Sequence, residues 1–345
     1  MCPVAKSSAV DLLPTGSTID PDGTLRLGGM RVDELAAEFG TPAFVLDESA
    51  LRARARAYAD GLTSRWPKGR VVFASKALPV TAVQRVMVQE GLGLDVAGGG
   101  ELLSALKAGV DPALVVLHGN AKSDEEIALA CEHRVGLIVV DNAADVDRLE
   151  AHVPAGTRQD VLVRVIPEVT AATHASVLTG HEGSKFGVPK AQVPALLARI
   201  RGSGRLHLKG LHAHVGSQIM EPEPLAAAVA PLAAMGEFEV YDLGGGLGAR
   251  YSYADRPATV DAYLEVLIGA AREHLPAAAE IIIEPGRSMV AETTATLYRV
   301  VTVKRGSHTF VAVDGGMGDN LEVALYGQRF EAVLAQRVHE PASEH

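Results

Sequence analysis

Residues 71–76 read Val-Val-Phe-Ala-Ser-Lys, a short apolar run that ends in a serine and a lysine. Seven similar runs follow along the chain, and each ends near a Gly, Asp, His or other polar residue before a helical stretch begins. Continuous apolar strands are typical of a parallel sheet that is covered on both faces. The eight predicted strands lie at residues 71–74, 93–96, 114–117, 137–140, 161–164, 210–214, 240–243 and 281–284.

The segments between these strands show helical spacing. Residues 101–108, for example, place Leu102, Leu103 and Leu106 on one face, and Gly109 after them is a suitable C-terminal cap. Eight strand–helix units predict an α/β fold, namely a closed (β/α)8 barrel of the TIM type. An open doubly wound sheet is the alternative, because a count of strands does not show that the sheet closes.

The two ends of the chain lack this alternation. Short β-like segments lie at residues 24–27 and 43–46. Residues 296–303 and 310–313 resemble two β-strands joined by a turn, with no helix between them. We therefore expect a second, β-rich domain that both ends of the chain build together.

This division predicts three segments. Residues 1–46 form the N-terminal part of the β-rich domain, residues 47–288 form the barrel, and residues 289–345 form a C-terminal part that looks incomplete. The last stretch, residues 338–345, is polar and ends without a clear closing strand or helix. An incomplete β-domain would leave strand edges unpaired.

The composition argues against several classes of protein. The chain holds 42 acidic and 32 basic residues, and a formal charge of −10 leaves no basic footprint for nucleic acid. No apolar run reaches the roughly 18 residues that span a bilayer, and the N-terminus lacks the features of a signal peptide. The two cysteines, Cys2 and Cys131, make no disulfide framework. We expect a cytoplasmic protein with neither a nucleic-acid nor a membrane partner.

Reactive side chains gather where the predicted strands end. In a barrel, the C-terminal ends of the strands meet at one face, where ligands bind. A lone lysine there is usually a solvated charge, a lone histidine can belong to the core, and three glycines can form a tight turn. All of these residues at one face instead predict a functional site. They are Lys76, Asp95, His118, Gly119, Asn120, Arg164, His214, Gly244, Gly245, Gly246, Glu284, Gly286 and Arg287.

Some of these groups have the chemistry of an anion site. The glycines at 244–246 let backbone N–H groups approach an anion, and a helix after them would add positive potential. Arg287 stands in a Pro-Gly-Arg turn, where its guanidinium suits a phosphate or a carboxylate. The segment from His214 to Ser217 adds a ring and a hydroxyl.

The order of the motifs resembles that of a known family. The motifs lie at residues 73–77, 94–102, 118–123, 184–187, 210–218, 244–246, 284–287 and 313–317. Their combination is specific, although each alone is weak. From about residue 23 to residue 336 the chain resembles the fold type III pyridoxal-phosphate (PLP) decarboxylases, most closely the diaminopimelate decarboxylases.

The resemblance implies a cofactor and the residues that hold it. Lys76 would bind PLP as a Schiff base, Glu284 would keep the pyridine nitrogen protonated, and His214 would stack on the ring. These three would be the catalytic residues. Desolvation near other cations favours the unprotonated amine that Lys76 needs. The cofactor-binding residues would be Lys76, Asp95, Arg164, His214, Ser217, Gly244, Gly245, Gly246, Glu284, Gly286 and Arg287, and no metal is implied.

The resemblance also implies a reaction. The enzyme would decarboxylate meso-2,6-diaminopimelate to L-lysine and CO₂, the last step of lysine biosynthesis. It would act on this small amino-acid substrate as a homodimer, and Arg287, Glu322 and Tyr326 would bind the substrate.

One residue departs from the family pattern. Residues 321–326 read Leu-Glu-Val-Ala-Leu-Tyr, and Glu322 stands where the family has an arginine that meets the distal carboxylate of the substrate. A like charge there is repulsive. The alternative is a substrate with a distal ammonium, such as lysine, ornithine or an amino acid of secondary metabolism. If Glu322 points to solvent, another group binds the substrate and Glu322 does not indicate which substrate it is.

The family also has a C-terminal Cys-Glu-Ser motif and a late tyrosine, and this sequence ends before both. We expect the sequence to be part of a longer protein. The alternative is a shortened homologue that binds the cofactor without catalysis. A barrel enzyme that handles sugar phosphates without PLP is a more remote alternative.

Overall fold

The computed structural model describes residues 12–169 and 184–338. The chain divides into two compact units, which we describe separately. The barrel unit comprises residues 52–248 and 257–288. The terminal unit comprises the chain before and after them together with residues 249–256, which lie inside the predicted barrel domain. Cys2 and all but the first residue of the polar stretch 338–345 lie outside the described residues.

Eight parallel strands close into a barrel, which confirms the predicted fold. Each strand pairs with the next along the chain, and β12 returns to β5 with Ile281 opposite Gly69. The alternative of an open doubly wound sheet is therefore wrong. The strands are β5 (Gly69–Ala74), β6 (Gly93–Val96), β7 (Val115–Leu117), β8 (Leu137–Val140), β9 (Gln159–Arg164), β10 (Leu206–His212), β11 (Val240–Asp242) and β12 (Glu280–Ile283).

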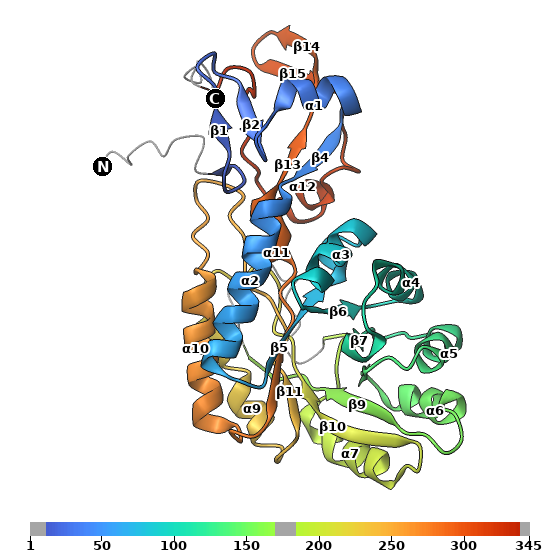
Figure 1. The fold of residues 1–345 in the computed structure, drawn as a ribbon. Helices are drawn as coiled ribbons and strands as arrows, with labels where there is room; N and C mark the ends of the chain where they lie inside the picture. Colours follow the sequence, from blue (N-terminus) through green and yellow to red (C-terminus); the bar gives the residue numbers. More distant parts are fainter. Residues whose placement is uncertain (1–11, 170–183, 339–345) are drawn as a thin grey trace. The chain divides into compact units, whose positions relative to one another are not determined.

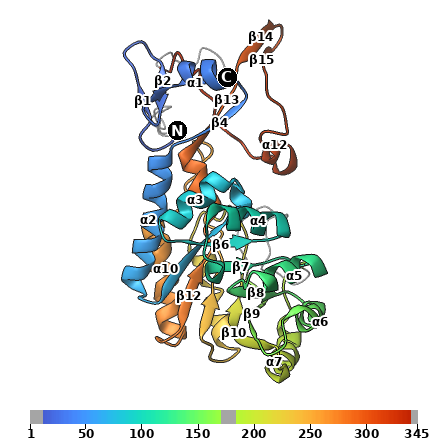
Figure 2. The ribbon, with the colours of Figure 1, turned by 45° about the vertical axis from the view of Figure 1, so that its right-hand side comes forward.

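Helices lie around the outside of the barrel (Figures 1 and 2). α2 leads into β5, and at least one helix follows each barrel strand. None of the described helices is long and apolar enough to cross a membrane. The helices that lie wholly or partly in this unit are α2 (Glu48–Arg65), α3 (Thr81–Gln89), α4 (Gly99–Ala108), α5 (Asp124–Glu132), α6 (Ala143–His152), α7 (Val193–Gly202), α8 (Glu223–Ala226), α9 (Val229–Ala233), α10 (Val260–His274) and α11 (Arg287–Val290).

Local signals start and stop these helices. Ser123 begins α5 with a capping box, in which its hydroxyl accepts the N–H of Glu126 and the Glu126 carboxylate accepts the N–H of Ser123. Gly109 ends α4 in the left-handed region, as predicted. The predicted apolar face of α4 is wrong at Leu103, which is exposed, because successive residues on a helix point about 100° apart and the core lies beside Leu102.

Apolar side chains from six of the strands fill the barrel interior. Burying a side chain of this kind stabilises a fold by about 1.5–3 kcal/mol. The barrel is therefore a packed core, and polar groups are left for its rim. The core cluster comprises Val72, Val116, Leu137, Val139, Leu162, Val240 and Ile282.

A glycine makes close packing possible on β10. Gly210 pairs with Leu162 of β9 on one side and with Val240 of β11 on the other. The register with β9 shifts between Leu208 and Gly210, so the strand carries a bulge there. A Cβ on Gly210 would overlap the carbonyl oxygen of Val240. This position therefore requires glycine.

The terminal unit is β-rich and uses both ends of the chain, which confirms that expectation. β1, β2 and β3 form one antiparallel sheet, β4 pairs with β13, and β14 pairs with β15. The elements are β1 (Thr18–Ile19), β2 (Leu25–Leu27), β3 (Met30–Arg31), α1 (Val32–Phe39), β4 (Ala43–Leu46), β13 (Thr294–Leu297), β14 (Val300–Arg305), β15 (Thr309–Val313) and α12 (Leu321–Tyr326).

The predicted strand at 296–303 is wrong in one respect, because the chain forms two strands there. β13 ends at Leu297 and β14 begins at Val300. Between them, the N–H of Arg299 donates to the Asp314 carboxylate at 2.9 Å, and the Arg299 carbonyl accepts the N–H of Asp314 at 3.1 Å. These bonds end the pairing with β4 and begin the pairing with β15.

Apolar side chains stay exposed on the β14–β15 sheet and on α12. A gathering of this kind usually marks an interaction surface. We call it the terminal apolar set. Its residues are Val300, Val301, Val303, Phe310, Val311, Val313, Leu321, Val323, Leu325 and Tyr326.

We predict that Gly210→Ala lowers the free energy of unfolding by about 2 kcal/mol or more. The added methyl group would overlap the backbone carbonyl of Val240, which is held in the sheet and has no other rotamer. Urea melts of the purified proteins measure this. Gly269→Ala on α10 is the matched control, since no atom lies within 4 Å of a Cβ there. Alanine at this exposed helical position should add roughly 0.5–1 kcal/mol. Equal stability of Gly210→Ala and the unchanged protein would contradict the prediction.

Candidate active site

The predicted site residues stand at the C-terminal ends of the barrel strands. Lys76 follows β5 in one turn of 3-10 helix, and Asp95 lies on β6. His214 follows β10, the glycines 244–246 follow β11, and Glu284 follows β12. Because the barrel is closed, these strand ends share one rim.

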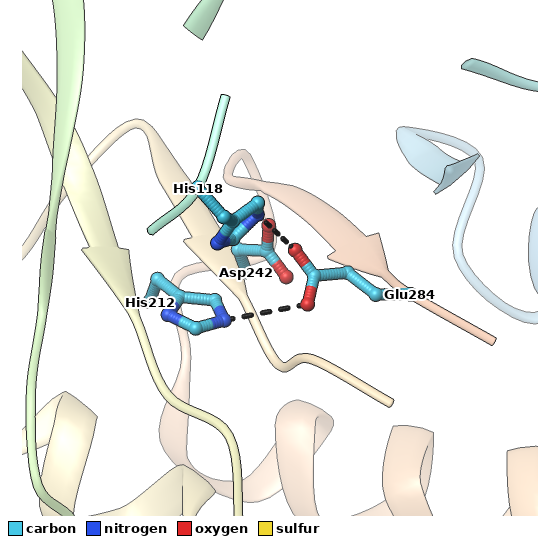
Figure 3. Close-up of side chains that lie close together, drawn as sticks. All are labelled: His118, His212, Asp242 and Glu284. Carbon is cyan, nitrogen blue, oxygen red and sulfur yellow. Dashed lines mark ion pairs between the residues drawn. The ribbon is translucent and has the colours of Figure 1, made fainter. Parts of the chain in front are cut away.

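Two histidines and two carboxyl groups gather inside this rim (Figure 3). Glu284 has a histidine at each oxygen: Oε1 lies 2.6 Å from Nε2 of His118, and Oε2 lies 3.4 Å from Nε2 of His212. The two imidazole centroids are 4.8 Å apart. Asp242 completes the group, and all four side chains are buried. We call these four residues the histidine–carboxylate cluster.

Burial makes charge costly in this cluster, and the two carboxyl groups respond in opposite ways. Burial acts against ionisation of Glu284, but His118 and His212 outweigh it and hold the pKa of Glu284 well below its usual range. Burial and the neighbouring Glu284 raise the pKa of Asp242 well above its usual range. These shifts favour the ionised form of Glu284 and the protonated form of Asp242.

His212 supports Glu284 without a positive charge. Burial lowers the pKa of His212 to about 4, although Glu284 opposes the shift. The ring is therefore neutral at neutral pH. A neutral imidazole donates through only one nitrogen, and the tautomer with its hydrogen on Nε2 is the one that points this donor at Glu284.

Asp95 is influenced by both the cluster and Lys76. Its Oδ1 lies 3.8 Å from Nε2 of His118. Burial, opposed by His118 and Lys76 and assisted by Glu284, raises the pKa of Asp95 to about 6. Lys76 itself is exposed. The described residues therefore do not provide the desolvation that the sequence analysis expects for its amine.

His214 presents a neutral ring at the same rim. Burial, with the charges of Lys76 and Arg164, holds the pKa of His214 well below its usual range. Its Nδ1 accepts the N–H of Gly245 at 3.3 Å. A neutral ring that is held at one nitrogen offers an aromatic face rather than a charge.

Three loops meet at the triple glycine. The N–H of Gly244 donates to Oδ1 of Asp242 at 2.9 Å, and the Gly244 carbonyl accepts the N–H of Glu284 at 2.8 Å. Gly244 and Gly246 have φ angles of 68° and 127°, which favour glycine. A Cβ on Gly245 would overlap the carbonyl oxygen of Glu284. The backbones therefore come closer here than other residues would allow.

Arg287 and Ser217 lie beside this loop. Nε of Arg287 donates to Oγ of Ser217 at 3.2 Å. A Cβ on Gly286 would lie 2.9 Å from Cβ of Ala74, so β5 and the loop after β12 pack closely. The chain from Ser217 reaches the glycine loop through an isolated bridge between Ile219 and Leu247. A guanidinium, a hydroxyl and backbone N–H groups in neighbouring loops have the chemistry of an anion site.

Arg164 has an aromatic partner. Its guanidinium carbon lies 4.7 Å from the centroid of the Phe186 ring. Burial lowers the pKa of Arg164, and Asp141 and Glu284 oppose the shift. The N–H of Gly187 donates to Oδ1 of Asp141 at 2.7 Å, which fixes the segment that carries Phe186. The predicted role of Arg164 around the cofactor stays a prediction.

A buried ion pair fixes the loop that carries His118. Nζ of Lys122 lies 2.9 Å from Oδ2 of Asp145 and also donates to the Gly119 carbonyl at 2.5 Å. The Asn120 amide donates to the carbonyl of Lys185 at 3.2 Å. Gly119 and Asn120, which the sequence analysis placed at the site, thus hold the loop in place.

Glu322 and Tyr326 lie on α12 in the terminal unit. The strand ends that carry the other predicted site residues belong to the barrel unit. The assignment of Glu322 and Tyr326 to substrate binding therefore stays a prediction, as does that of Arg287.

The sequence alone predicts no individual role for His118, His212 or Asp242. A signal for two of them was available. His212 and Asp242 lie inside the predicted strands 210–214 and 240–243, where a polar side chain interrupts an apolar run. Side chains two apart share a face of a strand, so His212 belongs with His214.

The cluster also has the donors of a metal site. One ligand atom from each of its four residues lies within 4.8 Å of every other. Imidazole and carboxylate donors suit a transition metal such as Zn²⁺. The expectation that the site holds no metal stays a prediction.

We predict that Asp95→Asn stabilises the protein near pH 7.5 but has little effect near pH 4. Because the pKa of Asp95 is raised, the folded protein binds its proton more tightly than the unfolded chain does, and stability falls as the pH rises from about 4 to about 6. The amide removes this loss of about 1–3 kcal/mol. Urea melts at the two pH values measure it, and an equal gain at both would contradict it.

Comparisons of sequence place the chain among known proteins. A family profile described as "Pyridoxal-dependent decarboxylase, pyridoxal binding domain" matches residues 48–291. Diaminopimelate decarboxylase of Bacillus subtilis is 39% identical over 92% of this chain and 76% of its own length. That of Actinosynnema pretiosum is 43% identical over 94% of this chain and 76% of its own length. The chain thus spans about three quarters of these relatives.

Solved structures agree with this placement. Diaminopimelate decarboxylase from M. jannaschii in complex with L-lysine has a TM-score of 0.85 and 26% identity, and the match covers 92% of this chain and 77% of that one. The Helicobacter pylori enzyme in complex with L-lysine has a TM-score of 0.81 and 27% identity, over 87% of this chain and 77% of that one. By profile, sequence identity and fold, the chain belongs to the pyridoxal-dependent decarboxylases and, among them, to the diaminopimelate decarboxylase family.

Proposed function

We infer that this chain is a PLP-dependent carboxy-lyase that decarboxylates meso-2,6-diaminopimelate to L-lysine and CO₂. Its relatives from B. subtilis and A. pretiosum are diaminopimelate decarboxylases, and the M. jannaschii enzyme holds L-lysine, the expected product. Within this chain, one observation carries the function. Glu284 is kept ionised in a buried cluster, at the barrel rim that also bears Lys76.

The described residues fit PLP. Oε1 of Glu284 is buried and makes no hydrogen bond to the described residues, although Nε2 of His118 lies 2.6 Å from it. A carboxylate oxygen has two lone pairs, so a protonated pyridine nitrogen could donate to it beside His118. The glycines 244–246 and Gly286 sit where a Cβ would meet backbone or a neighbouring side chain. The exposed amine of Lys76 is accessible to an aldehyde.

We propose a role for each predicted site residue. Lys76 supplies the amine that binds the cofactor aldehyde, His214 packs on the pyridine face, and Glu284 holds the proton on the pyridine nitrogen. Ser217, the glycines and Arg287 bind the phosphate, and Asp95 and Arg164 complete the surroundings. The cofactor-binding residues are thus Lys76, Asp95, Arg164, His214, Ser217, Gly244, Gly245, Gly246, Glu284, Gly286 and Arg287.

When bound, PLP supplies a sink for the electron pair that the departing carboxylate leaves behind. The residues of the chain prepare the site for this. A carboxylate in a buried, preorganised position stabilises positive charge more strongly than one in water, and Glu284 has such a position. His214 is neutral, so it adds no positive charge to compete with the protonated nitrogen. Burial raises the pKa of Asp95 to about 6, and the neighbouring Lys76 opposes this shift.

We propose the domain division that the sequence predicts. Residues 47–288 form the PLP-binding barrel, and residues 1–46 and 289–345 form the β-rich domain. Arg287, Glu322 and Tyr326 bind the substrate.

We also propose that the protein is a cytoplasmic homodimer. The terminal apolar set supports self-association, because exposed apolar groups gain free energy when a partner covers them. A cytoplasmic location suits an enzyme whose substrate and product are small polar amino acids.

Lys76 should be the site of covalent attachment. Incubation of the purified protein with PLP, borohydride reduction and peptide mapping should label Lys76, because reduction makes its bond to the aldehyde permanent. Lys76→Ala should lose both the label and the release of CO₂ from diaminopimelate. Lys107→Ala, on an exposed position of α4, should keep both. A label on another lysine, or none in a folded protein, would contradict the assignment.

Glu322 should limit the use of diaminopimelate if it meets the distal carboxylate. Glu322→Arg replaces repulsion by attraction and should raise kcat/KM for diaminopimelate relative to lysine by about tenfold, or roughly 1.4 kcal/mol. Glu38→Arg, an exposed change of the same charge in the same unit, is the control. No gain on diaminopimelate would show that Glu322 does not bind the substrate.

A further inference from the structure

Glu284 is contacted on both oxygens by histidines from different parts of the barrel (Figure 3). His118 follows β7, His212 ends β10 and Glu284 follows β12. Three strand pairings separate β12 from β7 around the barrel. The 2.6 Å contact between His118 and Glu284 therefore reaches across the barrel mouth, while His212 approaches from the other side.

We propose that His118 and His212 are positioning residues for the decarboxylation, because together they hold the carboxylate of Glu284 in the place and charge state that the pyridine nitrogen of the cofactor requires. We call this arrangement the Glu284 clamp. The inference rests on the proposed function and deepens it.

The histidine–carboxylate cluster is less favourable for folding than an apolar core of the same volume would be. Polar atoms that are buried without hydrogen bonds cost free energy, which apolar side chains of the same volume would avoid. The His118–Glu284 contact has the distance of a hydrogen bond but not its angles. Such a concentration of unsatisfied groups is typical of a functional site. The buried atoms without a hydrogen-bond partner among the described residues include His118 Nε2, His212 Nδ1 and Nε2, Asp242 Oδ2 and Glu284 Oε1.

The second carboxyl group explains why a clamp is needed. Asp242 and Glu284 lie in one buried cluster, and two such groups do not both ionise readily. Imidazole N–H groups at both oxygens of Glu284 favour the anion there and leave the proton on Asp242. Further titratable groups that interact with Glu284 or with its clamp include Asp95 from β6, Arg164 from β9, His214 after β10 and Tyr263 from α10. Without the clamp, the proton would be free to move to Glu284, whose carboxyl group would then no longer accept a hydrogen bond from the protonated cofactor nitrogen as an anion.

Paired substitutions separate a clamp from a structural role. His118→Leu and His212→Leu keep apolar volume and remove the N–H group, whereas His118→Gln and His212→Gln keep an N–H group. Each Leu variant should weaken PLP binding and lower kcat/KM by about tenfold or more, as expected when a buried carboxylate loses a polar neighbour. The Gln variants should recover most of this loss. His308→Leu, at an exposed position, should change neither quantity.

A measurement without the cofactor tests the clamp directly. Carbon-13 NMR of the apoprotein labelled at the glutamate carboxyl carbon follows the ionisation of Glu284, and Glu284→Gln assigns the signal. We expect Glu284 to stay ionised to a lower pH in the unchanged protein than in either Leu variant, with the Gln variants nearer to the unchanged protein. Folded Leu variants with an unchanged Glu284 titration and unchanged PLP affinity would overturn the proposal.

Two further outcomes keep the clamp distinct from the proposed function. If the unchanged protein does not take up PLP on Lys76, the proposed function fails, but the NMR titration of the apoprotein still decides whether the clamp exists. One equivalent of a transition metal in the purified protein, lost in His118→Leu, would overturn the clamp, because the histidines would then be metal ligands.

Discussion

Closure of the barrel is the constraint on which the rest of the site depends. Pairing of β12 with β5 and of β9 with β10 turns eight strands into a ring, so that strand ends far apart in the sequence share one rim. The contact between His118 and Glu284 is a direct consequence, because an open sheet would leave the ends of β7 and β12 apart. The packed apolar interior supports this ring and leaves its polar groups at the mouth.

Burial at this mouth acts on charge in two directions. The low dielectric constant of a buried site makes an isolated ion unfavourable. It also strengthens the interaction of an ion with the polar groups beside it. Histidines at both of its oxygens favour the ionised form of Glu284, whereas burial beside Glu284 raises the pKa of Asp242 and favours its protonated form. Two carboxyl groups of the same chemistry thus take different roles through their surroundings alone. His212 contributes as a neutral donor, which supports the anion without adding a second charge to the cluster.

The terminal unit shows a different balance between burial and exposure. Its small core, around Leu25, Leu27 and Leu297, ties the two ends of the chain together. By contrast, the β14–β15 sheet and α12 expose apolar side chains. Glu322 lies on the same α12, so the residue that distinguishes this chain from its family pattern belongs to the unit with the unsatisfied apolar surface. The proposed roles in substrate choice at Glu322 and in association thus fall in the terminal unit, and the proposed cofactor chemistry falls in the barrel unit.

The sequence by itself determined the eight strands, the helix end at Gly109 and the order of the motifs, because these depend on residues that are neighbours along the chain. It also placed Lys76 and Glu284 at strand ends. Only the tertiary structure decided that the sheet closes, that β13 and β14 part at Arg299, and that the cluster assembles around Glu284. Those features depend on pairings between distant segments and on the burial that these pairings create. The pattern of residues that are neighbours along the chain determines neither.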